Sequence, residues 1–336
     1  MNKKLIATLL SAAMCLSLAA CGQKADAPAG SGSGSGAVSA SNGEKTQYTV
    51  GICQLIQHVA LDAATQGFID ALNEALPGQV TIENKNASGE PNNCATIVNG
   101  FVSEGVDLIM ANATGALTAA ASATADIPIL GTSITAYGVA LDIDNFSGTV
   151  GGNISGTSDL ADLSKQADMI LEWFPETQKV GLLFCSAEPN SKYQIDEVAK
   201  HLADKGIETK EFAFTDTNDV ASVTQAAADY SDVVYIPTDN TAASNTEAIA
   251  NVLVPAGVPA ICGEEGICSG CGVATLSISY YDLGVTTGKM AAKILTGEAD
   301  ISTMPIEFTT ATPKYNASMC ETLGITPLEG YTAIEG

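Results

Sequence analysis

Polar residues that could hold a small molecule follow an apolar run at two places in the chain. Residues 232–236 are a short β-branched and aromatic run that Pro237 ends, so Asp239 and Asn240 fall at the carboxyl end of a predicted strand. Residues 107–111 lead in the same way to Thr114. Open α/β sheets bind ligands beyond the carboxyl ends of their strands, where helix amide hydrogens are free. Both places are therefore candidate binding sites.

An amino acid would fit these polar groups. Thr114, Thr132 and Ser133 would supply hydroxyls and helix-start amides for its carboxylate. Asp239 is the first candidate for its ammonium and Glu264 the second, because both follow predicted strands of the second half. The rest of the cleft would be lined by Gln54, Glu188, Asn190 and Asn240. For each residue the alternative is a cap or turn role, above all for Asn190 and Ser133.

An enzyme is the rival class, and the residue inventory argues against it. The chain has two histidines, of which His201 is expected on a solvated helix surface, and it lacks both a Walker loop and a Gly-x-Gly-x-x-Gly fingerprint after a strand. The carboxylates of Asp239, Glu264 and Glu188 could still form an acid and base pair. We therefore expect no catalysis and no cofactor.

A sugar or nucleoside is the alternative ligand class. Such ligands usually meet ring-stacking aromatic side chains in a cleft. Aromatic residues make up only 5% of the chain, although Tyr137 is a possible platform.

An internal repeat places the two candidate sites in similar surroundings. The segments that begin at residues 107 and 232 lie 125 residues apart, and 50–52 matches 180–182 at an offset of 130. Predicted strands and helices alternate within each half, which predicts parallel sheets. We therefore expect two similar lobes whose binding mouths face each other. The alternative is that any two α/β halves look alike, since short apolar strands are common.

The N-terminal segment predicts export and lipid attachment. Lys3 and Lys4 precede the apolar run 5–20, which is typical of a signal peptide and too short for a typical membrane span. Residues 18–21 end in Cys21 and resemble the bacterial lipoprotein signal, in which that cysteine carries the lipid; an ordinary secretory signal is the alternative. Residues 21–45 are rich in Gly, Ser and Ala, which predicts a flexible tether.

Charge and cysteine usage limit the possible partners. The chain has 38 acidic and 14 basic residues, which makes nucleic acid a poor partner. Cys262, Cys268 and Cys271 are the one candidate metal cluster, but a tetrahedral zinc site needs a fourth ligand and no histidine is near. We expect no metal there. Free thiols are favoured, and a disulfide within the cluster is the alternative.

Several motifs occur in order along the chain, at residues 51–58, 61–63, 67–68, 156–158, 237–240, 263–265 and 280–284. Together they resemble the motifs of the ABC-transporter substrate-binding lipoproteins of the tryptophan/tyrosine-binding type. Val59 and Ser279 depart from the proline and the acidic residue usual in that family.

The resemblance implies a type 1 periplasmic-binding fold, an α/β architecture of two Rossmann-like lobes joined by a three-strand hinge. The first lobe would comprise residues 46–155 and 277–305, and the second 156–276 and 306–336. It also implies an extracytoplasmic, lipid-anchored monomer that captures an amino acid-like, possibly aromatic, ligand and delivers it to an ABC permease.

Overall fold

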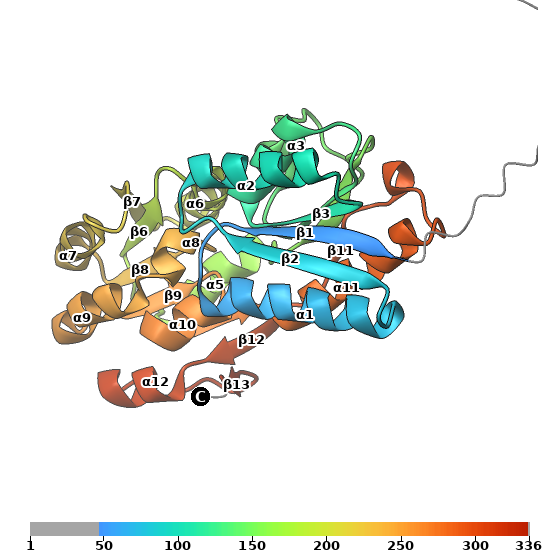
Figure 1. The fold of residues 1–336 in the computed structure, drawn as a ribbon. Coiled ribbons are helices and arrows are strands. Elements are labelled where there is room, and N and C mark those ends of the chain that lie inside the picture. The colour runs from blue at the N-terminus through green and yellow to red at the C-terminus, as the bar shows by residue number, and fades with distance from the viewer. Residues whose placement is uncertain (1–46, 335–336) are drawn as a thin grey trace, which may run out of the picture. The chain divides into compact units, whose positions relative to one another are not determined.

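Two β-sheets organise the computed structural model, which describes residues 47–334 (Figure 1). The first sheet has the strand order β11-β5-β4-β3-β1-β2, and all its pairings are parallel. Its strands are β1 (Tyr48–Gln54), β2 (Val80–Asn86), β3 (Leu108–Asn112), β4 (Ile129–Ile134), β5 (Ile154–Ser158) and β11 (Glu307–Phe308). This sheet and its helices form the first lobe.

The second sheet has the order β13-β12-β10-β9-β8-β6-β7, in which only the β10–β12 pairing is antiparallel. Its strands are β6 (Lys179–Cys185), β7 (Glu208–Phe214), β8 (Val233–Ile236), β9 (Ala260–Cys262), β10 (Ala274–Ser277), β12 (Thr312–Tyr315) and β13 (Thr332–Ala333). The order β9-β8-β6-β7 repeats the β4-β3-β1-β2 order of the first sheet. The predicted two-lobe parallel architecture is confirmed.

Helices cover both faces of each sheet. In the first lobe, α2 (Pro91–Glu104) and α3 (Thr114–Ala123) cover one face, and α1 (Val59–Ala75) and α11 (Tyr280–Leu295) the other (Figure 1). The short α4 (Tyr137–Ala140) follows β4, and a 3₁₀ turn spans Ile301–Thr303. Periodic apolar residues such as Leu61, Phe68 and Leu72 form the buried stripe of α1.

In the second lobe, one face packs against α5 (Leu163–Trp173), α6 (Pro189–Asp204) and α12 (Ala317–Leu323). The other packs against α7 (Val220–Tyr230), α8 (Asn240–Ala243), α9 (Thr246–Ala256) and α10 (Glu265–Cys271). Trp173 is buried against the ring of Tyr331, with ring centroids 5.1 Å apart, and is therefore a packing residue of this lobe.

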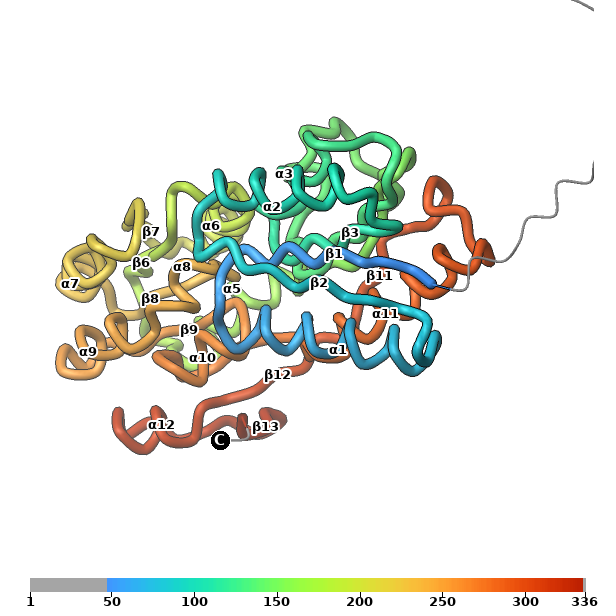
Figure 2. Tube along the Cα trace, viewed as in Figure 1, coloured from blue at the N-terminus to red at the C-terminus, as the bar shows by residue number. Residues whose placement is uncertain are grey.

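Three chain segments cross between the lobes. They connect β5 to α5, β10 to α11, and β11 to β12, and Figure 2 shows the last of these leading to α12 beside the second lobe. The first sheet extends to Ser158, beyond the expected lobe boundary at residue 155, and it includes β11, which was expected in the second lobe. β5 and β11 are short and poor in apolar residues, so the sequence gives a weak strand signal there.

Helices α1 and α11 approach each other closely. A Cβ built on Gly284 would lie 2.0 Å from the Ala64 carbonyl oxygen, and one on Gly67 would lie 2.1 Å from the Tyr281 carbonyl oxygen. Only glycine permits this approach. It fixes the start of α11, which lies at a crossover, against α1.

The seven cysteines of the described region are free thiols, each buried. No group of three or more His, Cys, Asp or Glu residues between 47 and 334 is arranged to hold a metal ion. None of the helices in that region is long and apolar enough to cross a membrane. The predicted signal peptide, Cys21 and the tether lie outside the described residues.

Candidate functional site

Loops at the carboxyl ends of both sheets line a small polar cavity of about 10 Å³, room for about one water molecule. Its lining comes from the first lobe, two crossovers and the second lobe, and consists of His58, Leu61, Ser133, Thr135, Asp159, Asn190, Thr238, Asp239, Asn240, Ala243, Glu264 and Tyr280. Three of these twelve side chains are carboxyls.

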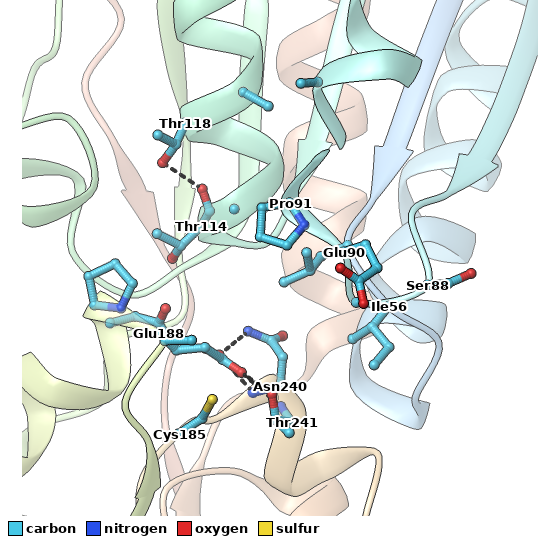
Figure 3. A pocket seen from close by; sticks show the side chains of 18 of the residues that line it. Ile56, Ser88, Glu90, Pro91, Thr114, Thr118, Cys185, Glu188, Asn240 and Thr241 are labelled. Carbon is cyan, nitrogen blue, oxygen red and sulfur yellow. Dashed lines mark hydrogen bonds between the residues drawn. The ribbon is translucent and has the colours of Figure 1, made fainter. Parts of the chain in front are cut away.

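A larger cavity of about 780 Å³ adjoins the small one, since Asn190 and Asn240 line both. Figure 3 shows Thr114 and Pro91 on one side of it and Glu188, Asn240 and Thr241 on the other. Neither cavity has a lysine or arginine among the described residues that line it. The two cavities together form a cleft with negative but no fixed positive side chains.

Asp159 lies in the first crossover, which connects β5 to α5, and only one of its two carboxylate oxygens is hydrogen-bonded within the described residues. The Tyr280 hydroxyl donates to its Oδ2 at 2.9 Å, whereas Oδ1 is buried and finds no hydrogen-bond partner among residues 47–334. The side chain is 5% exposed. Burial raises the pKa of Asp159 to about 6, and the Tyr280 and Thr135 hydroxyls offset part of that effect. A cationic group in the small cavity would satisfy Oδ1.

Two other buried polar atoms of the small cavity also lack partners in the described region, Ser133 Oγ and His58 Nδ1. Ser133 has a positive φ of 55°, an uncommon backbone conformation for a non-glycine residue. His58 Nε2 lies 3.3 Å from Asn240 Oδ1, a contact between the lobes. Burial lowers the pKa of His58, which favours the neutral ring.

The second-lobe carboxylates are bound to helix starts. Asp239 accepts hydrogen bonds from the backbone amides of Ala242 and Cys185, both at 2.7 Å. Glu264 accepts from the amides of Gly266 and Ile267. These bonds cap α8 and α10. They occupy the carboxylate oxygens that the sequence had predicted as acceptors for a ligand ammonium.

Glu188 also binds the start of α8. Its oxygens accept from the backbone amides of Asn240 at 3.0 Å and Thr241 at 2.8 Å, and from both of their side chains (Figure 3). The amide donors at the starts of α8 and α10 are thus already hydrogen-bonded to protein side chains.

The first-lobe helices that start at the cleft have no such cap. His58 precedes α1 and Ala113 precedes α3, and neither makes a side-chain capping bond. The first amides of a helix have no partner within it. The first amides of α1 and α3 therefore have no side-chain cap that would compete with a ligand for them.

The structure brings seven of the nine predicted ligand residues to the two cavities. Ser133, Asp239 and Glu264 line the small one, Thr114 and Glu188 the large one, and Asn190 and Asn240 both. Thr114 and Asp239 thus line adjoining cavities. Asn190 also donates to the Thr238 carbonyl oxygen at 3.2 Å, so the cap or turn alternative applies to it in part.

Gln54 and Thr132 lie elsewhere. The Gln54 side-chain amide donates to Ile56 O and Asp62 Oδ1 and accepts from Thr65 Oγ1, so it braces the start of α1. The Thr132 hydroxyl is within 3.2 Å of the hydroxyls of two other buried threonines, Thr157 and Thr287. Both residues line neither cavity because their polar atoms serve internal networks.

Sequence reasoning missed Asp159 and Tyr280 and gave His58 no role. Asp159 follows the hydroxyl-rich end of β5, and Tyr280 begins α11, so both lie at crossovers and not at a strand-to-helix turn within one lobe. Tyr137, the possible sugar platform, is buried, and its hydroxyl donates to the Gly131 and Thr157 carbonyl oxygens. It lines neither cavity, so it offers no stacking surface there.

Comparisons with known proteins identify the family of the chain. Residues 49–332 match the family described as ABC transporter substrate binding protein. A tyrosine-binding protein of Clostridioides difficile is 32% identical over 261 residues, which cover 76% of this chain and 74% of the relative.

Two solved structures of similar sequence differ in how well they superpose. A Streptococcus pneumonia ABC domain in complex with L-Trp has a TM-score of 0.81 at 30% identity, covering 86% of this chain and 100% of that one. A substrate-binding protein with adhesive properties from Clostridium difficile, in a ligand-free, open structure, has a TM-score of 0.66 at 31% identity, covering 86% and 99%. The family match spans most of the described region, and the chain belongs to the ABC transporter substrate-binding protein family.

Proposed function

We propose that the chain captures an amino acid, aromatic in its side chain, in the cleft between its lobes and delivers it to an ABC permease without changing it chemically. One observation carries the assignment of the ligand's charged groups. Asp159 Oδ1 is buried and unpartnered at the small cavity, and the starts of α1 and α3, at the same cleft, carry no side-chain cap.

These two features fit the two charges of an amino acid. The ammonium would bind Asp159, whose second oxygen is held by Tyr280. The carboxylate would bind the Ser133 hydroxyl and first-lobe amides near Thr114. Asp239 and Glu264 would hold the loops that surround the ammonium. This assignment replaces Asp239 with Asp159 as the ammonium acceptor, because both Asp239 oxygens already accept backbone bonds.

Two observations support an aromatic side chain on the ligand, namely the ligands of the similar proteins and the size of the larger cavity. The relatives named above include one that binds tyrosine and one in complex with L-Trp. The large cavity has apolar lining from Leu55, Ile56 and Pro91 beside the polar second-lobe wall, which suits an aromatic ring. The higher TM-score against the L-Trp complex, at nearly equal identity, supports a lobe arrangement close to that of a liganded relative.

A ligand screen tests the proposal. L-Tyrosine or L-tryptophan should raise the melting temperature of the protein by mass action, whereas ribose and adenosine should not. Titration calorimetry should then give a single site. A shift with ribose or adenosine and none with the amino acids would refute the proposal.

We also propose that Cys21 carries the lipid anchor and that the lipoprotein is an extracytoplasmic monomer, as the N-terminal sequence predicts. A Cys21→Ala variant should leave the membrane fraction and appear in the soluble one. Retention of that variant in the membrane would contradict the anchor.

A further inference from the structure

Three carboxyl side chains converge on the small cavity from three different connections. Asp159 belongs to the β5–α5 crossover, Asp239 to the β8–α8 turn and Glu264 to the β9–α10 turn. They are 5%, 1% and 2% exposed. The cavity has room for about one water molecule, so solvent cannot stabilise three negative charges there.

The other titratable groups near these carboxyls do not supply a compensating charge. Glu188, on the α6 side, adds a negative charge beside Asp239, and His58, at the start of α1, is favoured in its neutral form. Tyr280, at the start of α11, is a neutral hydrogen-bond donor.

Two further titratable groups supply no positive charge either. Cys185, at the end of β6, has a raised pKa because of burial, so it stays a thiol. Glu265, next to Glu264, is paired with Lys314 away from the cavity.

The carboxyls therefore hold protons that solvent-exposed carboxyls would lose. Burial is the main cause in each case and raises the pKa of Asp159 to about 6, of Glu264 to about 7 and of Asp239 to about 8. The backbone bonds to Glu264 and Asp239 oppose this effect only in part. The negative charge of Asp159 also raises the pKa of Glu264, so the ionisation of one of these two groups opposes that of the other.

We propose that this site exchanges protons for its ligand: when the ligand's ammonium group enters the small cavity beside Asp159, the surrounding carboxyls ionise and release protons to the solvent. The inference rests on the proposed function, because it needs a ligand that carries an ammonium group. Ionisation converts a carboxylic acid to a carboxylate and a free proton. The single ammonium charge that stays in the cavity balances one new negative charge, so the carboxyls together release at most about one proton per ligand.

The direction and size of the pH dependence of the ligand affinity follow from the pKa values of these carboxyls. The ammonium favours the ionised carboxyls, so the affinity rises with pH until the carboxyls of the ligand-free protein are already ionised. If only the ionisation of Asp159 is coupled to ligand binding, the affinity should rise about fourfold between pH 5.5 and pH 7.5. If the ionisation of Glu264 is coupled as well, the affinity should rise about a hundredfold over the same range.

Titration calorimetry of the whole chain with L-tryptophan and L-tyrosine tests the proposal. At pH 6.5, heats measured in phosphate and in imidazole should differ by the difference between the ionisation enthalpies of the two buffers, multiplied by the number of protons released. We expect release of between about 0.2 and 1 proton per ligand. The Glu264→Gln and Asp239→Asn variants should release fewer protons, whereas Asp162→Asn, an exposed cap of α5 outside both cavities, should match the wild type.

The outcomes separate this inference from the proposed function. Saturable binding with equal heats in both buffers and the same Kd at pH 5.5 and pH 7.5 would overturn proton exchange and leave the amino-acid site standing. Binding accompanied by proton uptake would overturn it as well. Failure of both amino acids to bind at any pH would overturn the proposed function and this inference together.

Discussion

Replacing Asp159 with asparagine should strengthen the ligand-free fold and weaken ligand binding. The folded pKa of Asp159, about 6, lies above its usual 3.8, so the folded protein binds its proton more tightly than the unfolded chain. The resulting penalty on stability is absent below about pH 4, grows as the pH rises, and is complete above about pH 6. Two pH units correspond to about 3 kcal/mol, an upper bound for this buried group.

Asparagine has nearly the same side-chain shape as aspartate but carries no charge, and its side-chain oxygen can still accept a hydrogen bond from the Tyr280 hydroxyl. Its new amide needs a partner of its own, so we expect a net gain of about 1–2 kcal/mol in the free energy of unfolding at pH 7.5 and none at pH 4. The affinity for L-tyrosine or L-tryptophan should fall by about 3 kcal/mol, roughly 150-fold, because the buried ammonium loses its counter-charge.

Urea denaturation at the two pH values and titration calorimetry at pH 7.5 measure both effects. The matched control is Asp162→Asn, three residues away, where an exposed N-cap is replaced by an equally good one and neither quantity should change. A wild-type affinity for Asp159→Asn, or a loss of stability at pH 7.5, would refute the assignment of the ammonium to this carboxylate.

Three further predictions follow from the packing and hydrogen bonds. Tyr280→Phe removes the donor to Asp159 Oδ2 and should weaken binding about tenfold by calorimetry at pH 7.5; an unchanged Kd would mean that the hydroxyl does not hold the acceptor. Gly284→Ala places a methyl group against the Ala64 carbonyl and should cost about 2 kcal/mol or more in urea, whereas Gly100→Ala, with open space around its Cβ, should be neutral or stabilising; equal effects would contradict the tight helix contact. Because all seven cysteines of residues 47–334 are buried, none should react with iodoacetamide until the protein unfolds, and rapid labelling of the native protein would contradict their burial.

Much of the fold could be predicted from the sequence because its signals are local. Apolar runs ending at proline or polar residues predicted β3 and β8, and the three- and four-residue spacing of apolar residues along α1 is the pattern of one buried helix face. The internal repeat predicted two similar lobes, and both sheets have the same order in their first four strands. β5 and β11 were not predicted as strands. They are short, and their pairing joins segments that lie far apart in the chain.

The candidate site was predicted in location but not in detail. Strand ends pointed to Asp239, Glu264 and Ser133, and the structure places all three at the small cavity. The sequence could not indicate that the oxygens of Asp239 and Glu264 would be used to cap helices, because an acceptor for a backbone amide and an acceptor for a ligand are the same chemical group. Asp159 was missed because its role depends on a crossover that brings it beside Tyr280, 121 residues later in the chain.

The most direct measurement is a crystal structure of residues 47–334 with bound L-tryptophan or L-tyrosine. It should place the ligand ammonium within hydrogen-bonding distance of Asp159 Oδ1, and the carboxylate against Ser133 and the first-lobe helix starts. A ligand bound outside the two cavities, or one whose carboxylate lies at Asp159, would contradict the account.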